Sequence, residues 1–403
     1  MKILWLAPFP HPRHPAQHPA PWLTTLAQAL AQQPGLELTV LNWESGLDAP
    51  VENFERDGIR FVFLRVPASR ADILSLYTRR VGIIREYLRR HHHRYNLIHV
   101  HGSEMQFQAA VAGLEVPVLL SVQGLISECV KALPDTVSVR RALWSLASYY
   151  ELKYLPQVRE FLCRTHWDKA HIARLSPGAR IHHNWEMLRP EFFGAAPRAG
   201  MPAAVPQVLF MGGTQVMKGF HETMQAFNLI RQETPARLVL VGDTYAEELV
   251  RYIRKAGLRH IEPGDVDCRR FQSSAQLIEL FRQSLCLLHP SYIDNSPNSV
   301  CEAQVAGLPV VASNVGGVSS LIDDGQTGLL SDLTPRNLAA AVLRLHHDPG
   351  FARRLAVQAH QVARLRHDPA TILQRTLDTY RGILQIPVPF SVAAPSTAMA
   401  ETA

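Results

Sequence analysis

One stretch of the chain limits the possible folds more than any other, because it places helix signals between two short apolar runs. It covers residues 289–313, HPSYIDNSPNSVCEAQVAGLPVVAS, and the apolar runs predict buried strands at 285–288 and 308–312. Ser296 is a natural N-cap and Pro297 is a natural first residue of a helix. The stretch therefore predicts a strand–helix–strand unit of an α/β sheet.

The start of this predicted helix has the character of an anion site. The N–H groups of Asn298, Ser299 and Val300 would have no partner inside the helix and would point out of its first turn. Asp294 precedes the helix, and Glu302 lies in its second turn. Open α/β sheets bind ligands at the carboxyl ends of their strands, so we expect a phosphate-containing ligand here.

The chain is long enough for two domains, since 403 residues can build two separate cores. Hydrophobic residues make up 47% and charged residues 19%, as in ordinary soluble proteins. No apolar run approaches the roughly 20 residues that cross a bilayer. The N-terminus, MKILWLAPFP, lacks a small-residue cleavage site and predicts a first core strand rather than a signal peptide.

The sequence indicates neither metal binding nor disulfide pairing. The five cysteines are scattered without C-x-x-C spacing, which predicts a cytoplasmic protein with no disulfide framework and no zinc site. Adjacent histidines such as His182 and His183 diverge on a strand or helix, and no carboxylate spacing accompanies them. We therefore expect no metal.

Much of the net charge of +6 comes from one segment, residues 76–94. Its apolar residues recur at helical spacing, and it carries six arginines: Arg79, Arg80, Arg85, Arg89, Arg90 and Arg94. Either this helix rests on an anionic membrane surface, or its basic face is solvated while its apolar stripe packs on the domain. We expect no nucleic acid as a partner, because no stacking aromatic side chains interleave with the basic ones.

Short apolar runs alternate with helical patterns along the chain, which predicts an α/β fold with two doubly wound parallel sheets. The first half predicts strands at 3–7, 36–41, 59–66, 97–100, 116–122 and 161–163, and helices at 21–33, 76–94 and 137–154. The second half predicts strands at 208–211, 237–241, 285–288, 310–312 and 328–330, and helices near 218–232, 245–256, 274–283, 297–306, 334–366 and 370–385.

These patterns divide the chain into domains. An N-terminal domain covers residues 1–193, and the segment 194–206, rich in Gly, Pro and Ala, is typical of a linker. A C-terminal domain covers 207–368, and a last helix follows at 369–386. The small, polar tail 387–403 is expected to be disordered.

Three segments resemble glycosyltransferase family 4, a group of retaining GT-B enzymes. They are MGGTQVMKG at 211–219, Asp243 at the end of LVLVGD, and the block 289–330 that ends in GGVSSLIDDGQTGLL. The resemblance is strong over 207–335 and implies two Rossmann-like domains that face each other across a cleft. In this family the C-terminal domain binds the nucleotide-sugar donor, the N-terminal domain binds the acceptor, and the last helix crosses back to the N-terminal domain. Transfer needs neither a metal nor another cofactor.

The resemblance also implies roles for individual residues. Lys218 would bind the diphosphate, where negative charge accumulates as the nucleotide leaves. Asp294 would contact the transferred sugar in place of the family's usual glutamate, and Glu302 would bind the ribose hydroxyls. With Lys218 and Asp294 as the catalytic residues, the predicted donor site consists of Gly212, Gly213, Lys218, Asp294, Asn298, Ser299, Val300 and Glu302.

The sequence departs from the family pattern at three places. Gly213 stands where an arginine normally accompanies the lysine, so a second phosphate cation is either missing or supplied by another residue. The loop after the first strand, residues 8–22, has no glycine pair. Gln123–Gly124 replaces a His-Gly pair near the sugar, and glutamine cannot titrate. On the acceptor side we expect His18, Gln123 and Gly124.

The resemblance implies a cytoplasmic, retaining glycosyltransferase, with peripheral attachment to the inner face of a membrane as an open alternative. It would move a sugar from a nucleotide diphosphate donor to a glycan or lipid-linked acceptor, in bacterial cell-surface polysaccharide biosynthesis. Two other functions stay open. One is a catalytically degenerate GT-B subunit that binds donor or partner, and the other is a sugar-nucleotide epimerase.

Overall fold

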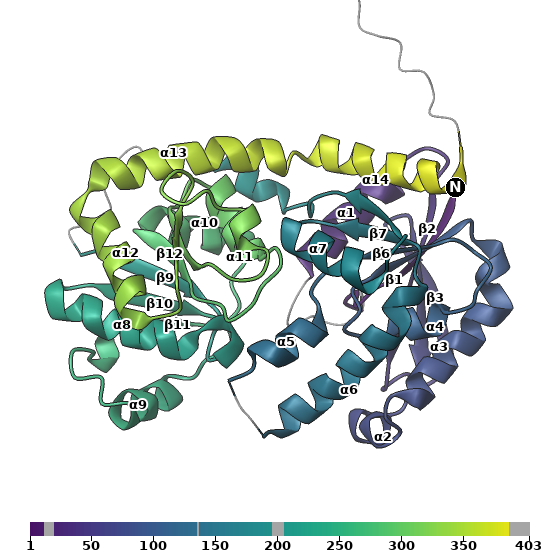
Figure 1. Cartoon of the computed structure of the whole chain (residues 1–403), viewed down its shortest axis with the longest axis horizontal. Coiled ribbons are helices and arrows are strands. Elements are labelled where there is room, and N and C mark those ends of the chain that lie inside the picture. The colour runs from purple at the N-terminus through teal and green to yellow at the C-terminus, as the bar shows by residue number, and fades with distance from the viewer. Residues whose placement is uncertain (12–19, 135–136, 196–204, 387–403) are drawn as a thin grey trace, which may run out of the picture.

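The computed structural model describes residues 1–11, 20–134, 137–195 and 205–386. Within these ranges the strands form two sheets, one of eight strands and one of six. Each sheet is the centre of an α/β domain, and each domain has two hydrophobic clusters. Figure 1 shows the two domains side by side, each with helices packed around its sheet. The predicted fold class is therefore confirmed.

The larger sheet belongs to the N-terminal half and has the order β3–β4–β2–β1–β5–β6–β7–β8. Its strands are β1 (Lys2–Leu6), β2 (Glu37–Glu44), β3 (Val51–Arg56), β4 (Ile59–Arg65), β5 (Leu97–His101), β6 (Val118–Ser121), β7 (Glu160–Cys163) and β8 (Arg180–His183). Neighbouring strands are parallel except β3 and β4. The sequence patterns missed β3 and β8, because VENFER and RIHH are too polar to read as core strands.

The helices of this half connect and cover the strands. They are α1 (Pro21–Ala31), α2 (Ser69–Leu74), α3 (Thr78–His91), α4 (Phe107–Val111), α5 (Ile126–Ala132), α6 (Val139–Tyr154) and α7 (His166–Leu175), with short 3-10 turns η1 (His92–Arg94), η2 (Leu155–Gln157) and η3 (Pro190–Gly194). α7 begins with a capping box, in which the Thr165 hydroxyl accepts from the N–H of Asp168 and the Asp168 carboxylate accepts from the N–H of Thr165.

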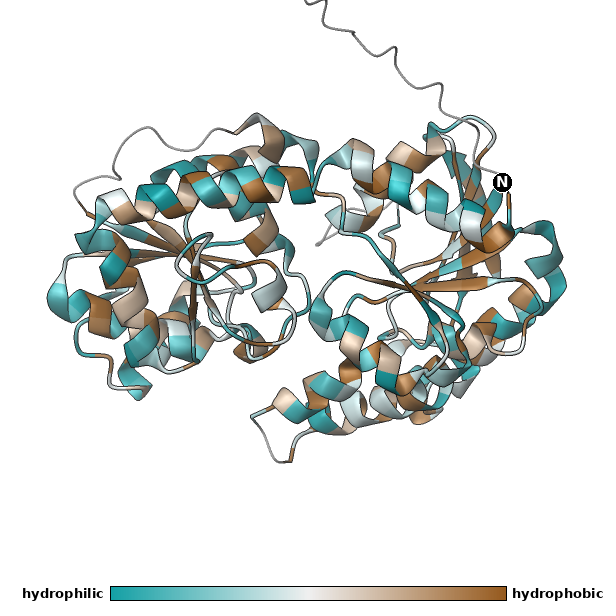
Figure 2. Ribbon diagram, turned by 45° about the horizontal axis from the view of Figure 1, so that its top comes forward, coloured by the Kyte–Doolittle hydropathy of each residue, from teal (hydrophilic) through white to brown (hydrophobic). Residues whose placement is uncertain are grey.

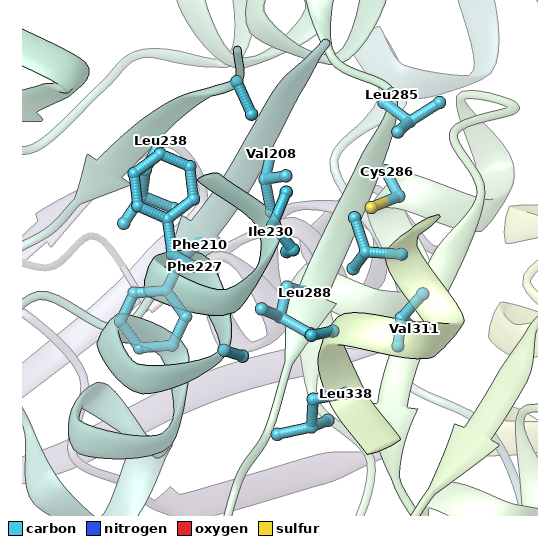
Figure 3. Close-up of a cluster of buried hydrophobic side chains, with 14 of the residues drawn as sticks. Val208, Phe210, Phe227, Ile230, Leu238, Leu285, Cys286, Leu288, Val311 and Leu338 are labelled. Carbon is cyan, nitrogen blue, oxygen red and sulfur yellow. The ribbon is translucent and has the colours of Figure 1, made fainter. Parts of the chain in front are cut away.

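The smaller sheet has the order β11–β10–β9–β12–β13–β14. Its strands are β9 (Gln207–Met211), β10 (Arg237–Val241), β11 (Val266–Arg269), β12 (Cys286–His289), β13 (Val310–Ser313) and β14 (Leu329–Ser331). All neighbours are parallel. Figure 3 shows the core on one face of this sheet, where side chains of β9, β10 and β12 meet Phe227 and Ile230.

Eight helices of the described residues, short 3-10 turns included, connect the strands of this sheet or follow its last strand. They are η4 (Val216–Lys218), α8 (Phe220–Glu233), α9 (Ala246–Lys255), η5 (Pro263–Asp265), α10 (Ser274–Gln283), α11 (Asn298–Val305), η6 (Val318–Ser320) and α12 (Pro335–His347). Two long helices then follow, α13 (Pro349–Arg366) and α14 (Pro369–Leu384). The single helix predicted at 334–366 is wrong, because Asp348 ends α12 and caps α13 through the N–H of Phe351 (2.8 Å).

The last two helices run one after the other along both domains (Figure 1). Figure 2 shows mixed hydrophilic and hydrophobic residues on them, whereas the strands of both sheets are largely hydrophobic. α13 packs against α11 in the C-terminal domain, whereas apolar side chains of α14 belong to the N-terminal core. The proposed linker, 194–206, lies mostly outside the described residues, and the tail 387–403 lies wholly outside them.

A buried hydrogen-bond network holds α14 on the N-terminal sheet. The hydroxyl of Tyr380 accepts from Trp5 Nε1 (3.0 Å) and lies 2.7 Å from His99 Nδ1, while His99 Nε2 lies 2.7 Å from Ser121 Oγ. Burial, reinforced by the charge of Arg164, lowers the pKa of His99 to about 3. The imidazole is therefore neutral at pH 7, with one ring nitrogen as a donor and the other as an acceptor.

Tyr380→Phe is expected to lower the free energy of unfolding by about 1–3 kcal/mol, because it leaves the buried Trp5 Nε1 without its acceptor. Chemical denaturation measures the change. The control is Tyr149→Phe, an exposed tyrosine, which we expect to shift stability by no more than about 0.5 kcal/mol. Equal effects of the two substitutions would contradict this account of how α14 is held.

Candidate functional site

Lys218 and Asp294 meet at the point where the strand order of the C-terminal sheet reverses. The chain leaves β9 toward β10 on one side, whereas β12 and β13 lie on the other. Lys218 ends the short turn that follows β9, and Asp294 lies in the loop that follows β12. Their Nζ and Oδ2 atoms are 2.6 Å apart. Crevices at such reversal points are where doubly wound sheets bind ligands, so this pair lies where a ligand site is expected.

The loop after β12 orients the Asp294 carboxylate. His289 Nε2 lies 3.2 Å from Asp294 Oδ2, and the hydroxyl of Ser291 donates to the same oxygen at 3.3 Å. Burial opposes ionisation, but the Lys218 charge and the His289 hydrogen bond outweigh it and hold the pKa of Asp294 well below its usual range. Asp294 is therefore a fixed negative charge, suited to accept hydrogen bonds from hydroxyl groups.

Helix α11, next to this pair, begins one residue later than the sequence predicts. The N-cap is Pro297, not Ser296, and α11 begins at Asn298. Ser296 instead donates its hydroxyl to the buried carboxylate of Glu186. The prediction of a free Val300 N–H is also wrong, because that group donates to the carbonyl of Pro297 (3.0 Å). Among the described residues, the N–H groups of Asn298 and Ser299 have no protein partner, so they remain as candidate anion-binding donors.

Glu302 is buried in α11 and pairs with a residue that sequence patterns did not identify. Arg189 donates to both of its carboxylate oxygens, from Nε at 2.8 Å and from Nη2 at 2.7 Å. Burial raises the pKa of Glu302, and the Arg189 hydrogen bonds lower it in part. A carboxylate that accepts two hydrogen bonds from one arginine still has lone pairs for a further hydroxyl donor. Arg189 precedes η3, 113 residues away in sequence, and no local motif marks it.

Gly213 is held in a conformation that excludes a side chain. Its φ is +55°, and a Cβ built there would lie 2.5 Å from the carbonyl oxygen of Asp243 and 2.7 Å from its nitrogen. These are backbone atoms of the strand end that follows β10, so they cannot move aside as a flexible side chain would. A Cβ built at Gly212 would likewise lie too close to the Phe210 ring and to Lys218 Cβ. The backbone geometry of this loop therefore explains why position 213 is glycine and not arginine.

Gly213→Arg is expected to lower the melting temperature and not to raise nucleotide affinity, because strain and the clash with Asp243 act before the guanidinium can reach a phosphate. Differential scanning fluorimetry with and without nucleoside diphosphates measures both quantities. Thr214→Arg, one residue further along the same loop, is the matched control for added charge. A stable Gly213→Arg protein with tighter nucleotide binding would contradict this prediction.

The acceptor-side residues predicted in the N-terminal domain lie at the end of β6. Arg164 Nη2 donates to Gln123 Oε1 (2.8 Å), and Gly124 follows directly. His18 lies outside the described residues. The two domains meet beside this point, because the hydroxyl of Thr165 donates to Asn295 Oδ1 (2.6 Å) and Asn295 Nδ2 donates to Asp168 (2.9 Å). Asn295 is the neighbour of Asp294, so the structure brings the two predicted half-sites together.

One group of potential metal ligands occurs among the described residues: Glu186, Cys301 and His367, all buried. Each residue has protein partners, although Glu186 Oε2 has no hydrogen-bond partner among the described residues. Glu186 accepts from Ser296 and from Cys301 (3.3 Å), and its backbone carbonyl pairs with His367. Arg164 Nε lies 3.5 Å from Glu186 Oε2 and supplies positive charge. These contacts describe a buried hydrogen-bonded cluster between the domains rather than an open ligand set.

Comparison with known proteins agrees with this geometry. Residues 205–348 match the model of the family described as glycosyl transferases group 1. The chain is 31% identical over 238 residues to the D-inositol 3-phosphate glycosyltransferase of Nocardioides sp., covering 53% of this chain and 49% of that protein. It therefore spans about half the length of the curated relatives that it matches.

Solved structures match over nearly the whole chain. The sucrose-phosphate synthase of Thermosynechococcus elongatus superimposes with a TM-score of 0.74 at 19% identity, covering 96% of this chain and 100% of that one. The Anabaena protein HepE in complex with UDP gives 0.64 at 18% identity, covering 95% and 100%. The chain thus has the GT-B fold, and residues 205–348 in its C-terminal half are similar to the glycosyl transferases group 1 family.

Proposed function

We propose that this protein is a retaining glycosyltransferase of family 4 that takes its sugar from a nucleoside diphosphate donor. The observation that carries the proposal is the Lys218–Asp294 pair (2.6 Å) at the reversal point of a sheet whose domain matches the group 1 family. The N–H groups of Asn298 and Ser299 face the same region from the start of α11. UDP bound to the similarly folded HepE supports a nucleotide as the ligand.

In the proposed reaction the bond between the anomeric carbon and the diphosphate oxygen breaks, and a bond from that carbon to an acceptor oxygen forms on the same face. Lys218 and the two N–H groups neutralise the charge that develops on the leaving diphosphate. Asp294 accepts hydrogen bonds from the donor sugar, and Glu302, held by Arg189, accepts them from the ribose. Because these groups supply the electrostatic stabilisation, the proposal requires no metal, and activity should persist in EDTA.

We also propose that the acceptor is a glycan or lipid-linked molecule of bacterial cell-surface polysaccharide biosynthesis, used at the cytoplasmic face of a membrane. α3 supports the membrane contact, although not with all six arginines, because Arg80 is buried against Asp72 (3.4 Å). Two apolar side chains, Leu74 (84% exposed) and Leu76 (56% exposed), lie just before this basic helix. Exposed apolar residues beside cations are typical of interfacial binding.

A groove between α3 and strands β2–β4 continues this basic surface, with a volume of about 1470 Å³ and Arg60, Arg90 and Arg94 among its lining residues. Among the described residues, no helix combines the length and apolarity needed to cross a bilayer. Flotation with vesicles containing anionic lipid tests the membrane proposal. Loss of binding on neutralising Arg79, Arg89 and Arg90 supports it, and unchanged binding excludes this surface.

The second candidate function is a donor-binding subunit without turnover. Gly213 favours it, because the loop has no room for the cation that the resemblance leads one to expect. This candidate predicts nucleotide binding at the same place with no transfer. An epimerase is less well supported, since it would need acid/base residues in the N-terminal domain and no sequence motif marks a pair of them there.

The deciding experiment is nucleotide release. Purified full-length protein is incubated with UDP-, GDP- and ADP-linked sugars, with and without candidate polyprenyl-phosphate-linked or oligosaccharide acceptors, and nucleoside diphosphate is quantified. Acceptor-dependent release supports the transferase. Binding of a donor by calorimetry with no release in any combination supports the non-catalytic subunit instead.

A further inference from the structure

Glu104 lies at the second reversal point of the molecule, in the N-terminal sheet. The strand order there runs from β1 to β2 on one side and from β1 to β5 on the other. Glu104 follows the carboxyl end of β5, three residues after His101. The same topological rule that places Lys218 and Asp294 in the donor crevice therefore places this acid in the crevice of the opposite domain.

Two glycines, Gly102 and Gly124, leave room for the Glu104 carboxylate because they have no side chains. A Cβ at Gly102 would collide with its Oε2, and a Cβ at Gly124 would lie 3.2 Å from its Oε1. The carboxylate thus lies against the end of β6, beside Gln123. No cation pairs with Glu104 within the parts of the chain that the structure describes. An acid that is partly buried and has no ion-pair partner is a costly arrangement unless it has a task.

A neighbouring group also lacks a partner. The amide oxygen of Gln123 accepts from Arg164, but its Nε2 is buried and has no hydrogen-bond partner among the described residues. Most buried polar atoms in proteins are satisfied, so an orphaned donor indicates a place where a ligand is received. Gln123 Nε2 and the Glu104 carboxylate together offer a donor and an acceptor, which is the pair of contacts that a sugar hydroxyl makes.

The donor site adjoins this pair across the domain boundary. Asn295, the residue after Asp294, donates through Nδ2 to the carbonyl of Val122, the residue before Gln123, at 3.5 Å. The thiol of Cys129 in α5 is subject to the charges of Glu104, Asp294 and Lys218 together. Glu104 and Asp294 therefore lie in opposite domains, and both are close enough to Cys129 for their charges to act on it.

We propose that Glu104 binds the attacking hydroxyl of the acceptor and takes its proton during transfer, and this rests on the proposed function above. The acceptor oxygen bonds to the anomeric carbon as the carbon–phosphate-oxygen bond breaks and the nucleoside diphosphate leaves. The proton of the acceptor hydroxyl passes to the Glu104 carboxylate and afterwards to water. Glu104 would thus supply the titrating function that Gln123 cannot.

The charges around Glu104 suit this role. Burial raises the pKa of Glu104 to about 7, and the negative charge of Glu151 on α6 acts in the same direction. Hydrogen bonds from the N–H groups of Glu104 and Gly124, and the charge of Arg164 after β7, lower the pKa in part. Cys129 on α5 is the remaining titratable group identified near it, and burial raises its pKa to about 12, so it stays neutral. A base must be ionised to act, so kcat/KM should fall below pH 7 and reach a plateau above it.

The test compares Glu104→Gln, Glu104→Asp and the control Glu115→Gln, an exposed acid before β6 in the same domain, in the full-length protein. In wild type, Glu104→Asp and Glu115→Gln, kcat/KM should show an acidic limb, falling tenfold per pH unit below the pKa of the base. Glu104→Gln should lose about 10²-fold at pH 8 and show no acidic limb. Nucleoside diphosphate affinity and melting temperature at pH 8 show whether the variants stay folded and bind the donor.

Two readouts separate the possible failures. An acidic limb that persists in Glu104→Gln, with measurable transfer by wild type, overturns this inference and leaves the proposed function intact. Absence of transfer by wild type with every donor overturns both. In side-chain ¹³C spectra, a glutamate signal that titrates near pH 7 in wild type should be missing from Glu104→Gln, and its persistence contradicts the proposal independently of turnover.

Discussion

Replacing Lys218 by alanine is expected to lower kcat by about 10²–10³-fold, which corresponds to about 2.7–4 kcal/mol of lost transition-state stabilisation. The reason is electrostatic: Lys218 Nζ is the cation that meets Asp294 at 2.6 Å at the end of β9, where the diphosphate would leave. With Gly213 closed to a side chain, no neighbour in that loop can substitute for it. Steady-state nucleotide release with a saturating donor measures the effect.

Lys255→Ala is the matched control, since Lys255 is an exposed lysine at the end of α9 in the same domain. It should leave kcat within about twofold of wild type, because surface substitutions away from a site have small effects. Thermal unfolding of both variants shows whether the loss comes from folding. Unchanged kcat in folded Lys218→Ala would exclude the proposed role of this residue.

Arg189→Met is expected to produce the largest loss of stability, about 3–5 kcal/mol in the free energy of unfolding, because it leaves the buried Glu302 carboxylate without its bidentate partner. Urea denaturation at pH 7 measures the loss. The exposed pair Arg282–Glu279 (3.7 Å) provides the control, and Arg282→Met should cost no more than about 1 kcal/mol.

The stability deficit of Arg189→Met should depend on pH, and the pKa of Glu302 sets the direction of that dependence. Burial raises the pKa of Glu302 in the folded protein, and Arg189 counteracts it, so removing Arg189 raises that pKa further. A raised folded-state pKa favours the folded state at acid pH, and that advantage is lost as the pH rises. The deficit of Arg189→Met should therefore be smallest near pH 4 and grow toward pH 7. The double variant Arg189→Met/Glu302→Gln should recover most of the deficit at pH 7, and a deficit that persists unchanged would contradict the account.

The sequence predicted the elements that carry strong patterns. Apolar runs identified β1, β9, β12 and β13, and helical patterns identified α1 and α10. VENFER, RIHH and VDCR formed β3, β8 and β11 without such runs, because edge strands gain their stability from one neighbour and can remain polar. The helix at α11 was found, but its start moved by one residue because the buried Glu186 carboxylate binds the Ser296 hydroxyl.

Lys218 and Asp294 meet where strand ends converge, and a local motif was enough to find both of them. Their long-range partners were not predictable in the same way. Arg189 lies 113 residues from Glu302, and Tyr380 lies 281 residues from His99. Glu104 stands in a loop without a motif, and only the packing of Gly102 and Gly124 around it distinguishes it from an ordinary surface acid.

The central claim is that the nucleoside diphosphate binds at the reversal point of the C-terminal sheet. A crystal structure of the full chain with the nucleoside diphosphate of the best donor tests it most directly. We predict the terminal phosphate within hydrogen-bond distance of Lys218 Nζ and of the N–H groups of Asn298 and Ser299, with the ribose hydroxyls on Glu302. A diphosphate bound elsewhere, for example in the basic groove beside α3, would contradict the account.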